Sequence, residues 1–296
     1  MVGPEAPGWH LAGANVFLFI VQVAVSIGVF LFAPEGSWAP SKAHDSSAGA
    51  LDSSGSLAVE RPTASTLTPT NLLAPPPYVL LIWVLIYIFM GMTVITDCFY
   101  PTYSFFITSD DPKFLRQWFQ LACLANMAWV ALDMWFSWVH MAAFALAVLW
   151  CTVLPLYLFV VRHATPRYSQ AWIYYFCSEF SIRLYFGWLS TDAIFSIASV
   201  MEYLHGGFFG FSLYATLLGL LLVLAFGTYV HGHDPVVGLV VTWVLCGLIF
   251  KQATYPEETQ EIFNELRAVA IVVTPVFPIL VFVDSLRYIY IVRWKV

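Results

Sequence analysis

Residues 75–92 read PPPYVLLIWVLIYIFMGM, a triple proline followed by a long apolar run without a charged side chain. A helix needs about 20 predominantly apolar residues to cross the hydrocarbon core of a bilayer, and the uncharged run continues to Asp97. Proline is tolerated in the first turn of a helix, so the triple proline marks its start. The stretch predicts a transmembrane helix over residues 78–99.

The same apolar character extends along the whole chain. Hydrophobic residues make up 60% and charged residues 10% of the 296 positions, whereas soluble domains average roughly 45–50% and about 25%. The apolar blocks are continuous rather than alternating, which disfavours a β-barrel. We therefore predict an all-α, polytopic transmembrane helix bundle. The expected spans are residues 11–33, 78–99, 117–136, 138–161, 179–201, 209–230, 235–250 and 268–285.

The distribution of Lys and Arg between the loops predicts the orientation. With eight spans both termini lie on one side. That side carries Lys113, Arg116, Arg162, Arg167, Arg287, Arg293 and Lys295, and the other side carries Lys42, Arg61, Lys251 and Arg267. The positive-inside rule places both termini on the cytoplasmic or equivalent face, without naming an organelle. The net charge of −6 and the lack of a basic cluster give no reason to expect a nucleic-acid partner.

Two polar stretches interrupt the apolar blocks. Residues 35–77 are rich in Ser, Thr, Ala and Pro, and we expect a flexible loop on the outer side. Residues 254–267 carry four glutamates at helical spacing, and we expect a short amphipathic helix with a solvated acidic face. The predicted organisation is the N-terminus and first helix (1–34), the loop (35–77), four further helices (78–201) and a C-terminal extension of about three helices (202–296).

Aromatic and amide side chains recur at helical spacing in three of the predicted spans. Residues three or four apart share a helix face. The sets are Trp83, Tyr87 and Gly91 in the second span, Asn126 and Trp129 in the third, and Tyr185 and Trp188 in the fifth. In this order, these segments resemble the translocator protein family, also called the tryptophan-rich sensory protein or TspO family. The resemblance covers residues 11–201, and the last three spans lie outside its five-helix pattern.

The resemblance implies a five-helix core with an aromatic-lined pocket that opens toward one membrane face. Family members bind porphyrins, sterols and other flat hydrophobic molecules, so the resemblance implies such a ligand. It implies no cofactor firmly, and it leaves a homodimer open. The implied ligand-binding residues are Trp83, Tyr87, Asn126, Trp129, Tyr185, Trp188 and Asp192. Asp192 stands where the family typically has alanine. The alternative is that these aromatic residues fill the core or form interfacial belts.

Charged residues inside the predicted spans need partners or a function. Glu179 and Arg183 are four apart in the order that favours a same-face pair, and we expect a structural ion pair. Asp133 and Asp192 have no obvious partner. A buried carboxylic acid favours its protonated form, in which it can hold a ligand carbonyl, relay a proton or act as a general acid.

Other motifs with a recognisable chemistry are scarce. His231, His233 and Asp234 form HGHD between the sixth and seventh spans, where we expect a solvated turn rather than a metal site. The sequence contains no nucleophile elbow, phosphate loop or HExxH motif. Common hydrolase and nucleotide chemistries therefore have no local support.

Three functions are compatible with these features. The leading one is a non-enzymatic membrane protein that binds, transports or senses a flat hydrophobic ligand such as a tetrapyrrole or sterol. The second is an intramembrane cyclase or isomerase that uses Asp133 and Asp192 as acids, which requires both carboxylates to converge on the pocket. The third is a structural or assembly subunit of a membrane complex, which predicts a collapsed pocket.

Overall fold

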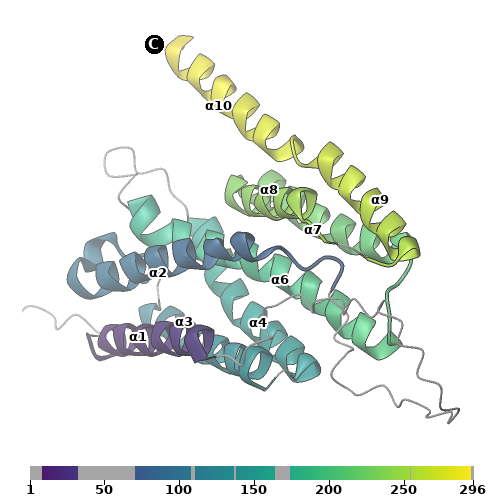
Figure 1. Ribbon diagram of the computed structural model, residues 1–296. Helices are drawn as coiled ribbons and strands as arrows, with labels where there is room; N and C mark the ends of the chain where they lie inside the picture. Colours follow the sequence, from purple (N-terminus) through teal and green to yellow (C-terminus); the bar gives the residue numbers. More distant parts are fainter. Residues whose placement is uncertain are drawn as a thin grey trace, which may run out of the picture.

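The structure is a computed structural model that describes residues 9–32, 71–107, 111–136, 138–163, 174–253 and 255–294. All regular elements in these ranges are helical, which confirms the predicted all-α bundle (Figure 1). The α-helices are α1 (Trp9–Phe32), α2 (Ile82–Phe99), α3 (Pro112–Val130), α4 (Val139–His163), α6 (Phe180–His205), α7 (Phe211–Gly232), α8 (Pro235–Phe250), α9 (Glu257–Val273) and α10 (Val276–Trp294). Shorter turns are the 3-10 helices η2 (Pro77–Leu81) and η3 (Pro101–Tyr103) and the π-helices η4 (Ala131–Trp135) and η5 (Tyr175–Glu179).

Within the described ranges, six helical segments are long and apolar enough to cross a membrane. They are α1, η2 with α2, α4, η5 with α6, α7, and α9 with α10. The helix α8 is equally apolar but has only 16 residues, and it packs against α6 and α7. The helix α3 is more polar because Lys113 and Arg116 lie in its first turns, and it packs against α1 and α4. These two helices account for the remaining predicted spans.

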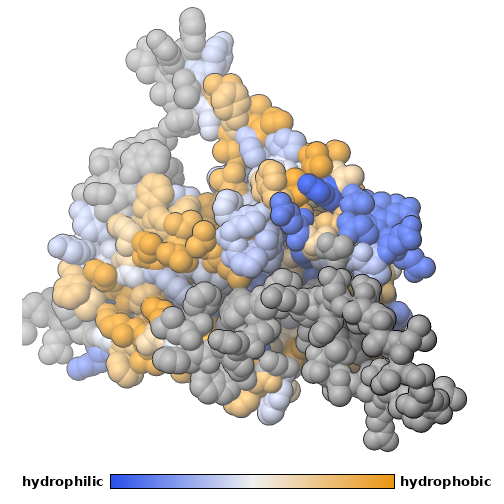
Figure 2. Space-filling view, viewed as in Figure 1, coloured by the Kyte–Doolittle hydropathy of each residue, from blue (hydrophilic) through white to orange (hydrophobic). Residues whose placement is uncertain are grey.

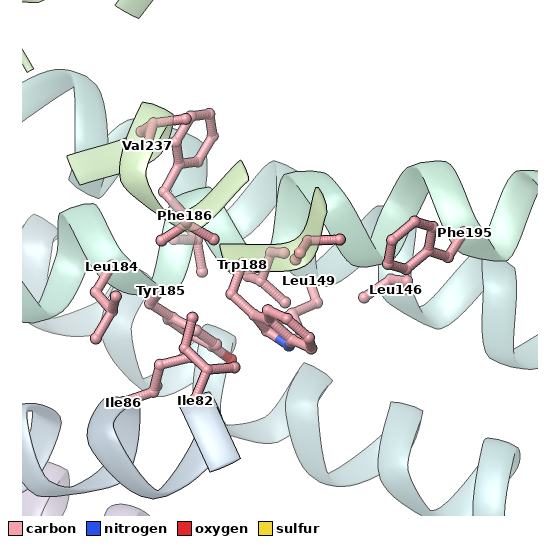
Figure 3. Close-up of a cluster of buried hydrophobic side chains, with 14 of the residues drawn as sticks. Ile82, Ile86, Leu146, Leu149, Leu184, Tyr185, Phe186, Trp188, Phe195 and Val237 are labelled. Carbon is pink, nitrogen blue, oxygen red and sulfur yellow. The ribbon is translucent and has the colours of Figure 1, made fainter. Parts of the chain in front are cut away.

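The helix α6 lies at the centre of the bundle. Residues 181–191 are all buried, since α2 and α4 pack against α6 on one side and α8 on the other. Figure 3 shows Tyr185 and Trp188 pointing toward α2, whereas Phe186 points toward Val237 of α8. The span with the most charged residues is therefore an interior helix, with no broad lipid-facing surface in this stretch.

Small residues let α8 pass close to its neighbours. A Cβ atom on Gly187 of α6 would lie 3.3 Å from the Cα of Val237. On α8 itself, a Cβ atom on Gly238 would lie 2.3 Å from Cδ1 of Phe277, which belongs to α10. Small residues at helix contacts are typical of membrane bundles, because they allow backbones to approach. The helix α8 is thus packed tightly between α6 and α10.

The end of the predicted flexible loop is packed rather than free. Residues 33–70 lie outside the described part of the chain, but Asn71, Leu72 and Leu73 are buried. The Asn71 amide donates to the Phe195 carbonyl at 2.8 Å, and the Lys251 ammonium donates to the Leu72 carbonyl at 3.1 Å. The flexible-loop expectation is therefore wrong for residues 71–73, because the asparagine and the two leucines are buried and bonded to α6 and to Lys251 after α8.

The helix α9 contains both the acidic stretch and the beginning of the last predicted span. We expected a separate amphipathic helix over residues 254–267, but α9 runs on to Val273 and turns into α10 at Pro275. The glutamates of α9 are exposed as predicted, and Figure 2 shows a hydrophilic patch in the region of α9. Along α10, which projects from the bundle in Figure 1, the exposed side chains include Phe282 and Leu286. This apolar surface suits contact with lipid.

Candidate functional site: an aromatic cluster in the bundle

Five of the predicted ligand-binding residues meet in one cluster around Trp83 of α2. We call Trp83, Tyr87, Trp129, Tyr185 and Trp188 the aromatic cluster. The Trp83 ring centroid lies 5.5 Å from that of Tyr87, 5.6 Å from Trp129, and 6.1 Å from both Tyr185 and Trp188. Aromatic pairs at such distances contribute about 0.5–1.5 kcal/mol each beyond the burial of their area. The cluster joins α2, α3 and α6.

The members of the cluster differ in exposure. Trp188 and Tyr185 are 0% and 1% exposed, and Trp129 is 8% exposed. Trp83 and Tyr87 are only partly buried. The α6 side of the cluster is therefore a packed core, whereas its α2 side remains accessible from outside the bundle.

Two hydrogen bonds fix the polar groups around the rings. The Asn126 amide of α3 donates to the Tyr185 hydroxyl at 2.7 Å, and both residues are buried. The hydroxyls of Ser26 on α1 and Tyr87 on α2 are 2.9 Å apart. Because a buried hydrogen bond constrains both side chains, these contacts orient one ring from α6 and one from α2. Asn126 thus lies beside the aromatic cluster, bonded to one of its rings.

Several buried polar atoms near the cluster have no hydrogen-bond partner in the described structure. They include Asn126 Oδ1, Trp188 Nε1 and Asp192 Oδ2. Buried polar groups in proteins are nearly always paired, and leaving one unpaired costs about 1–3 kcal/mol. Asn126 Oδ1 can accept a hydrogen bond and Trp188 Nε1 can donate one to a molecule beside the rings. Asp192 Oδ2 accepts when it is ionised and can donate when it is protonated.

The two carboxylates that the sequence singled out differ in their surroundings. Asp192 lies on α6, one turn beyond Trp188, and is partly buried. Asp133 lies in η4 and is exposed, although the two carboxylates are close enough for their charges to interact. Asp192 therefore borders the aromatic cluster, whereas the Asp133 side chain lies at the surface of the bundle.

An ion pair and a buried turn lie on the side of α6 that faces α8. Arg183 Nη2 lies 3.1 Å from Glu179 Oε2, so the expected ion pair is present. Arg183 Nη1 also lies 3.5 Å from Asp234 Oδ2. Asp234 is 0% exposed, whereas His231 and His233 are exposed. The predicted solvated turn is thus wrong for Asp234. Its Oδ1 caps α8 by accepting from the Val236 amide at 2.9 Å, a role that an aspartate before a proline signals in sequence.

A second buried ion pair, between Arg116 and Asp97, was not predicted from the sequence. Arg116 donates through Nε to Asp97 Oδ2 at 2.9 Å and through Nη2 to Oδ1 at 2.8 Å, and both side chains are buried. The Ser104 hydroxyl donates to the same carboxylate at 2.8 Å. From the sequence, Arg116 was assigned to a loop and used only to predict the orientation in the membrane. The signal that could have found the pair is Asp97, a lone acid at the end of an apolar span.

The fold and the cluster together define a class of protein. Within the described ranges, six helical segments are able to cross a bilayer, which makes this chain an integral multi-pass membrane protein. The sequence profile of the family described as TSPO-like protein matches residues 55–283. That is well over half of the chain, so the chain belongs to the TSPO-like protein family, as the resemblance indicated. Comparisons with curated proteins and with solved structures find no match.

The family match reaches beyond the five-helix pattern. It extends from residue 55 to residue 283 and so includes α7, α8 and α9 and part of α10. In the structure, α7 and α8 pack against α6, α9 packs against α7 and α8, and α10 packs against α8. Trp243 of α8 and Lys251 directly after it also donate hydrogen bonds to the segment before α2, at the Val79 and Leu72 carbonyls. The C-terminal helices therefore belong to the family region and contribute to its packing.

Proposed function

We propose that this TSPO-like protein binds a flat hydrophobic ligand, of the tetrapyrrole or sterol kind, at the aromatic cluster, and that it carries or senses that ligand in the membrane. The observation that carries the proposal is the position of Trp83. Its ring contacts four other rings of the site and still remains partly accessible. A flat ligand can therefore reach the cluster from the α2 side.

The chemistry of the surroundings supports a ligand with both apolar and polar parts. Small-molecule sites are mostly apolar and contain a few well-placed polar groups. Here the rings supply the apolar surface, and Asn126 Oδ1, Trp188 Nε1 and Asp192 Oδ2 supply unpaired hydrogen-bonding atoms. Asp192, which replaces the alanine typical of the family, adds a carboxyl group that can bind a ring N–H or a hydroxyl.

The orientation in the membrane is part of the same proposal. Both termini face the cytoplasmic or equivalent side, because Lys and Arg are more frequent in the loops on that side. In this orientation α2 begins on the outer side, so Trp83 lies in the outer half of the bundle. Single cysteines introduced at residues 2 and 52, in a variant whose five native cysteines are replaced by serine, are labelled on intact cells with a membrane-impermeant reagent to test the assignment. We expect residue 52 to react and residue 2 to be protected, and the reverse pattern would refute it.

Photoaffinity labelling tests the site in the intact protein. Porphyrin and sterol probes that carry a diazirine are irradiated with the protein in lipid nanodiscs, and the modified peptides are mapped by mass spectrometry. We expect labels within α2 and α6, removed by an excess of the unlabelled compound. Labels confined to the exposed faces of α7 or α10, or labels that no competitor removes, would contradict the proposal.

A further inference from the structure

A second amide side chain, Gln22 of α1, lies beside the aromatic cluster. It is 1% exposed, in a part of α1 that is otherwise apolar from Val16 to Val25. The Gln22 side chain hydrogen-bonds to the Tyr87 hydroxyl, which also lies 2.9 Å from the Ser26 hydroxyl. Its Oε1 atom is buried and has no hydrogen-bond partner in the described structure. The helix α1, which supplies no ring of the cluster, therefore reaches it through a polar side chain.

Gln22 and Asn126 are placed in the same way around two tyrosines of the cluster. Asn126 donates to the Tyr185 hydroxyl at 2.7 Å, and its Oδ1 atom has no partner. Gln22 has the corresponding relationship to Tyr87. The Tyr87 and Tyr185 hydroxyls lie close enough to interact electrostatically, and the Cys123 thiol lies near both. The two unpartnered amide oxygens therefore flank one pair of tyrosine hydroxyls.

Two free amide oxygens are costly inside a membrane bundle. Buried polar groups in proteins are nearly always paired, and the hydrocarbon core of a bilayer has no water to pair with them. The bonds to the tyrosines do not require these oxygens, because the amide N–H groups make them. The oxygens of Gln22 and Asn126 are thus available to hydrogen-bond donors of a bound molecule.

The charges around the cluster select against an anionic group at this place. Of the described basic side chains, the buried Arg116 and Arg183 pair with acids elsewhere in the bundle, and Lys251 donates to backbone carbonyls before α2. The other lysines and arginines whose side chains are described lie at the surface. Asp192, which borders the cluster, adds a carboxyl group. A carboxylate or sulfate held beside the two amide oxygens would have no described cation to pair with, which is costly in a buried site.

We propose that Gln22 and Asn126 form the donor-selective polar end of the ligand site, where they bind an O–H or N–H group of a neutral flat molecule and determine its specificity. This inference rests on the proposed function, since it places the polar group of a ligand whose ring system lies at the aromatic cluster. The two amide oxygens accept from the ligand. Trp188 Nε1, which is also unpartnered, is available to donate to a hydroxyl oxygen. Anionic groups of a ligand stay outside the bundle.

One fluorescent sterol scaffold with three polar ends tests the proposal. Dehydroergosterol, its 3-methyl ether and its 3-sulfate are added to the full chain in lipid nanodiscs, and energy transfer from tryptophan gives the dissociation constants. The methyl ether keeps the acceptor oxygen but lacks the donor, and the sulfate adds a negative charge. We expect the hydroxyl probe to bind roughly 2- to 12-fold more tightly than the ether, the equivalent of one hydrogen bond, and the sulfate no more tightly than the ether. Equal constants for hydroxyl and ether, or tightest binding of the sulfate, would overturn the proposal.

Variants at Gln22 test the residue itself. Gln22→Leu and Gln22→Met both remove the amide and keep an apolar side chain of similar size. In each, the affinity for the hydroxyl probe should fall to that for the ether, whereas the affinity for the ether should not change. Gln120→Leu is the matched control, because it removes an amide of α3 that donates to the Leu11 carbonyl at 3.4 Å, and it should keep the wild-type preference. A hydroxyl preference that persists in both Gln22 variants would overturn the role of Gln22.

The outcomes separate this inference from the proposed function. If Trp83→Leu weakens all three probes but the wild type shows no preference for the hydroxyl, the aromatic cluster binds the ligand and the donor-selective end is wrong. Saturable binding of protoporphyrin IX without binding of any sterol probe would likewise leave a site at the cluster and overturn the neutral, donor-bearing ligand. No saturable binding of any of these compounds would overturn both.

Discussion

Trp83 of α2 and Trp129 of α3 stack on one another, with ring centroids 5.6 Å apart and ring planes at 25°. Tyr185 and Trp188 of α6 meet the Trp83 ring edge-on, at 67° and 77°. The stack holds two helices together, and the edge contacts bind both to the central helix. Any ligand that inserts among these rings must replace favourable contacts with better ones, which favours an aromatic or polycyclic molecule.

The hydrogen bond between Asn126 and Tyr185 is expected to stabilise the cluster. Asn126→Leu leaves the buried tyrosine hydroxyl unpaired, which costs about 1–3 kcal/mol. Tyr185→Phe leaves the amide unpaired instead, and the double variant removes both unpaired groups. We therefore expect the double variant to be less destabilised than the sum of the two single variants, as measured by unfolding in detergent. Strict additivity would show that the bond does not couple them.

The close approach of α8 and α10 is expected to tolerate no side chain at Gly238. A Cβ atom there would lie 2.3 Å from the buried Phe277 ring, so Gly238→Ala must displace α10 or the ring. Overpacking of this kind costs about 1–3 kcal/mol. Gly219→Ala on α7 is the matched control, since no atom lies within 4 Å of its Cβ position. Melting temperatures should fall only for Gly238→Ala; equal melting temperatures would argue against tight packing here.

Lys251 is expected to make stability depend on alkaline pH. Burial lowers the pKa of its ammonium from 10.5 to about 8, although the charge of Glu202 opposes this shift. Between these two values the unfolded chain binds a proton that the folded protein does not, so stability rises with pH in this range. Lys251→Met should flatten the rise in a pH series of unfolding curves.

Lys113→Met serves as the control for that series, because Lys113 is an exposed lysine of α3. Its pH profile should follow the wild type. A wild-type profile that falls steadily from pH 8 to 10.5, or a Lys251→Met profile identical to the wild type, would contradict the burial of Lys251 against the carbonyls of residues 71 and 72.

The ion pair between Arg116 and Asp97 is expected to be sensitive to the loss of one partner. Asp97→Ala leaves a guanidinium buried without its carboxylate, and breaking such a pair typically costs about 3–5 kcal/mol. Glu258→Ala, which removes an exposed acid of α9, should change stability by roughly 0.5 kcal/mol or less. Unfolding in detergent measures both. Similar small effects for the two variants would mean that the α2–α3 connection does not rely on this pair.

Sequence reasoning found the helices and the aromatic cluster because both depend on local patterns. Apolar runs define membrane spans directly, and helical spacing places Trp83 and Tyr87 on one face of α2. Their convergence with Tyr185 and Trp188 followed from the resemblance to a known family, since no pattern within one helix says which faces meet. The role of these residues in binding a ligand stays a prediction.

The missed features depend on contacts between distant segments. Asp234 in a polar HGHD turn reads as solvated, and only the packing of α8 onto α6 brings it to Arg183. Likewise, Leu72 belongs to a stretch whose composition predicts flexibility, but the partner that anchors it, Lys251, lies far along the chain. Hydropathy and spacing carry no information about such pairings.

The most direct test of the account is the dissociation constant of protoporphyrin IX, measured by tryptophan quenching in lipid nanodiscs. Trp83→Leu removes the central ring, and Trp138→Leu removes an exposed tryptophan outside the cluster. Saturable binding that Trp83→Leu weakens by roughly 2- to 12-fold, the equivalent of one aromatic contact, and that Trp138→Leu leaves unchanged is the predicted result. Equal dissociation constants for the two variants, or no saturable quenching by protoporphyrin or a sterol analogue, would contradict a ligand site at the aromatic cluster.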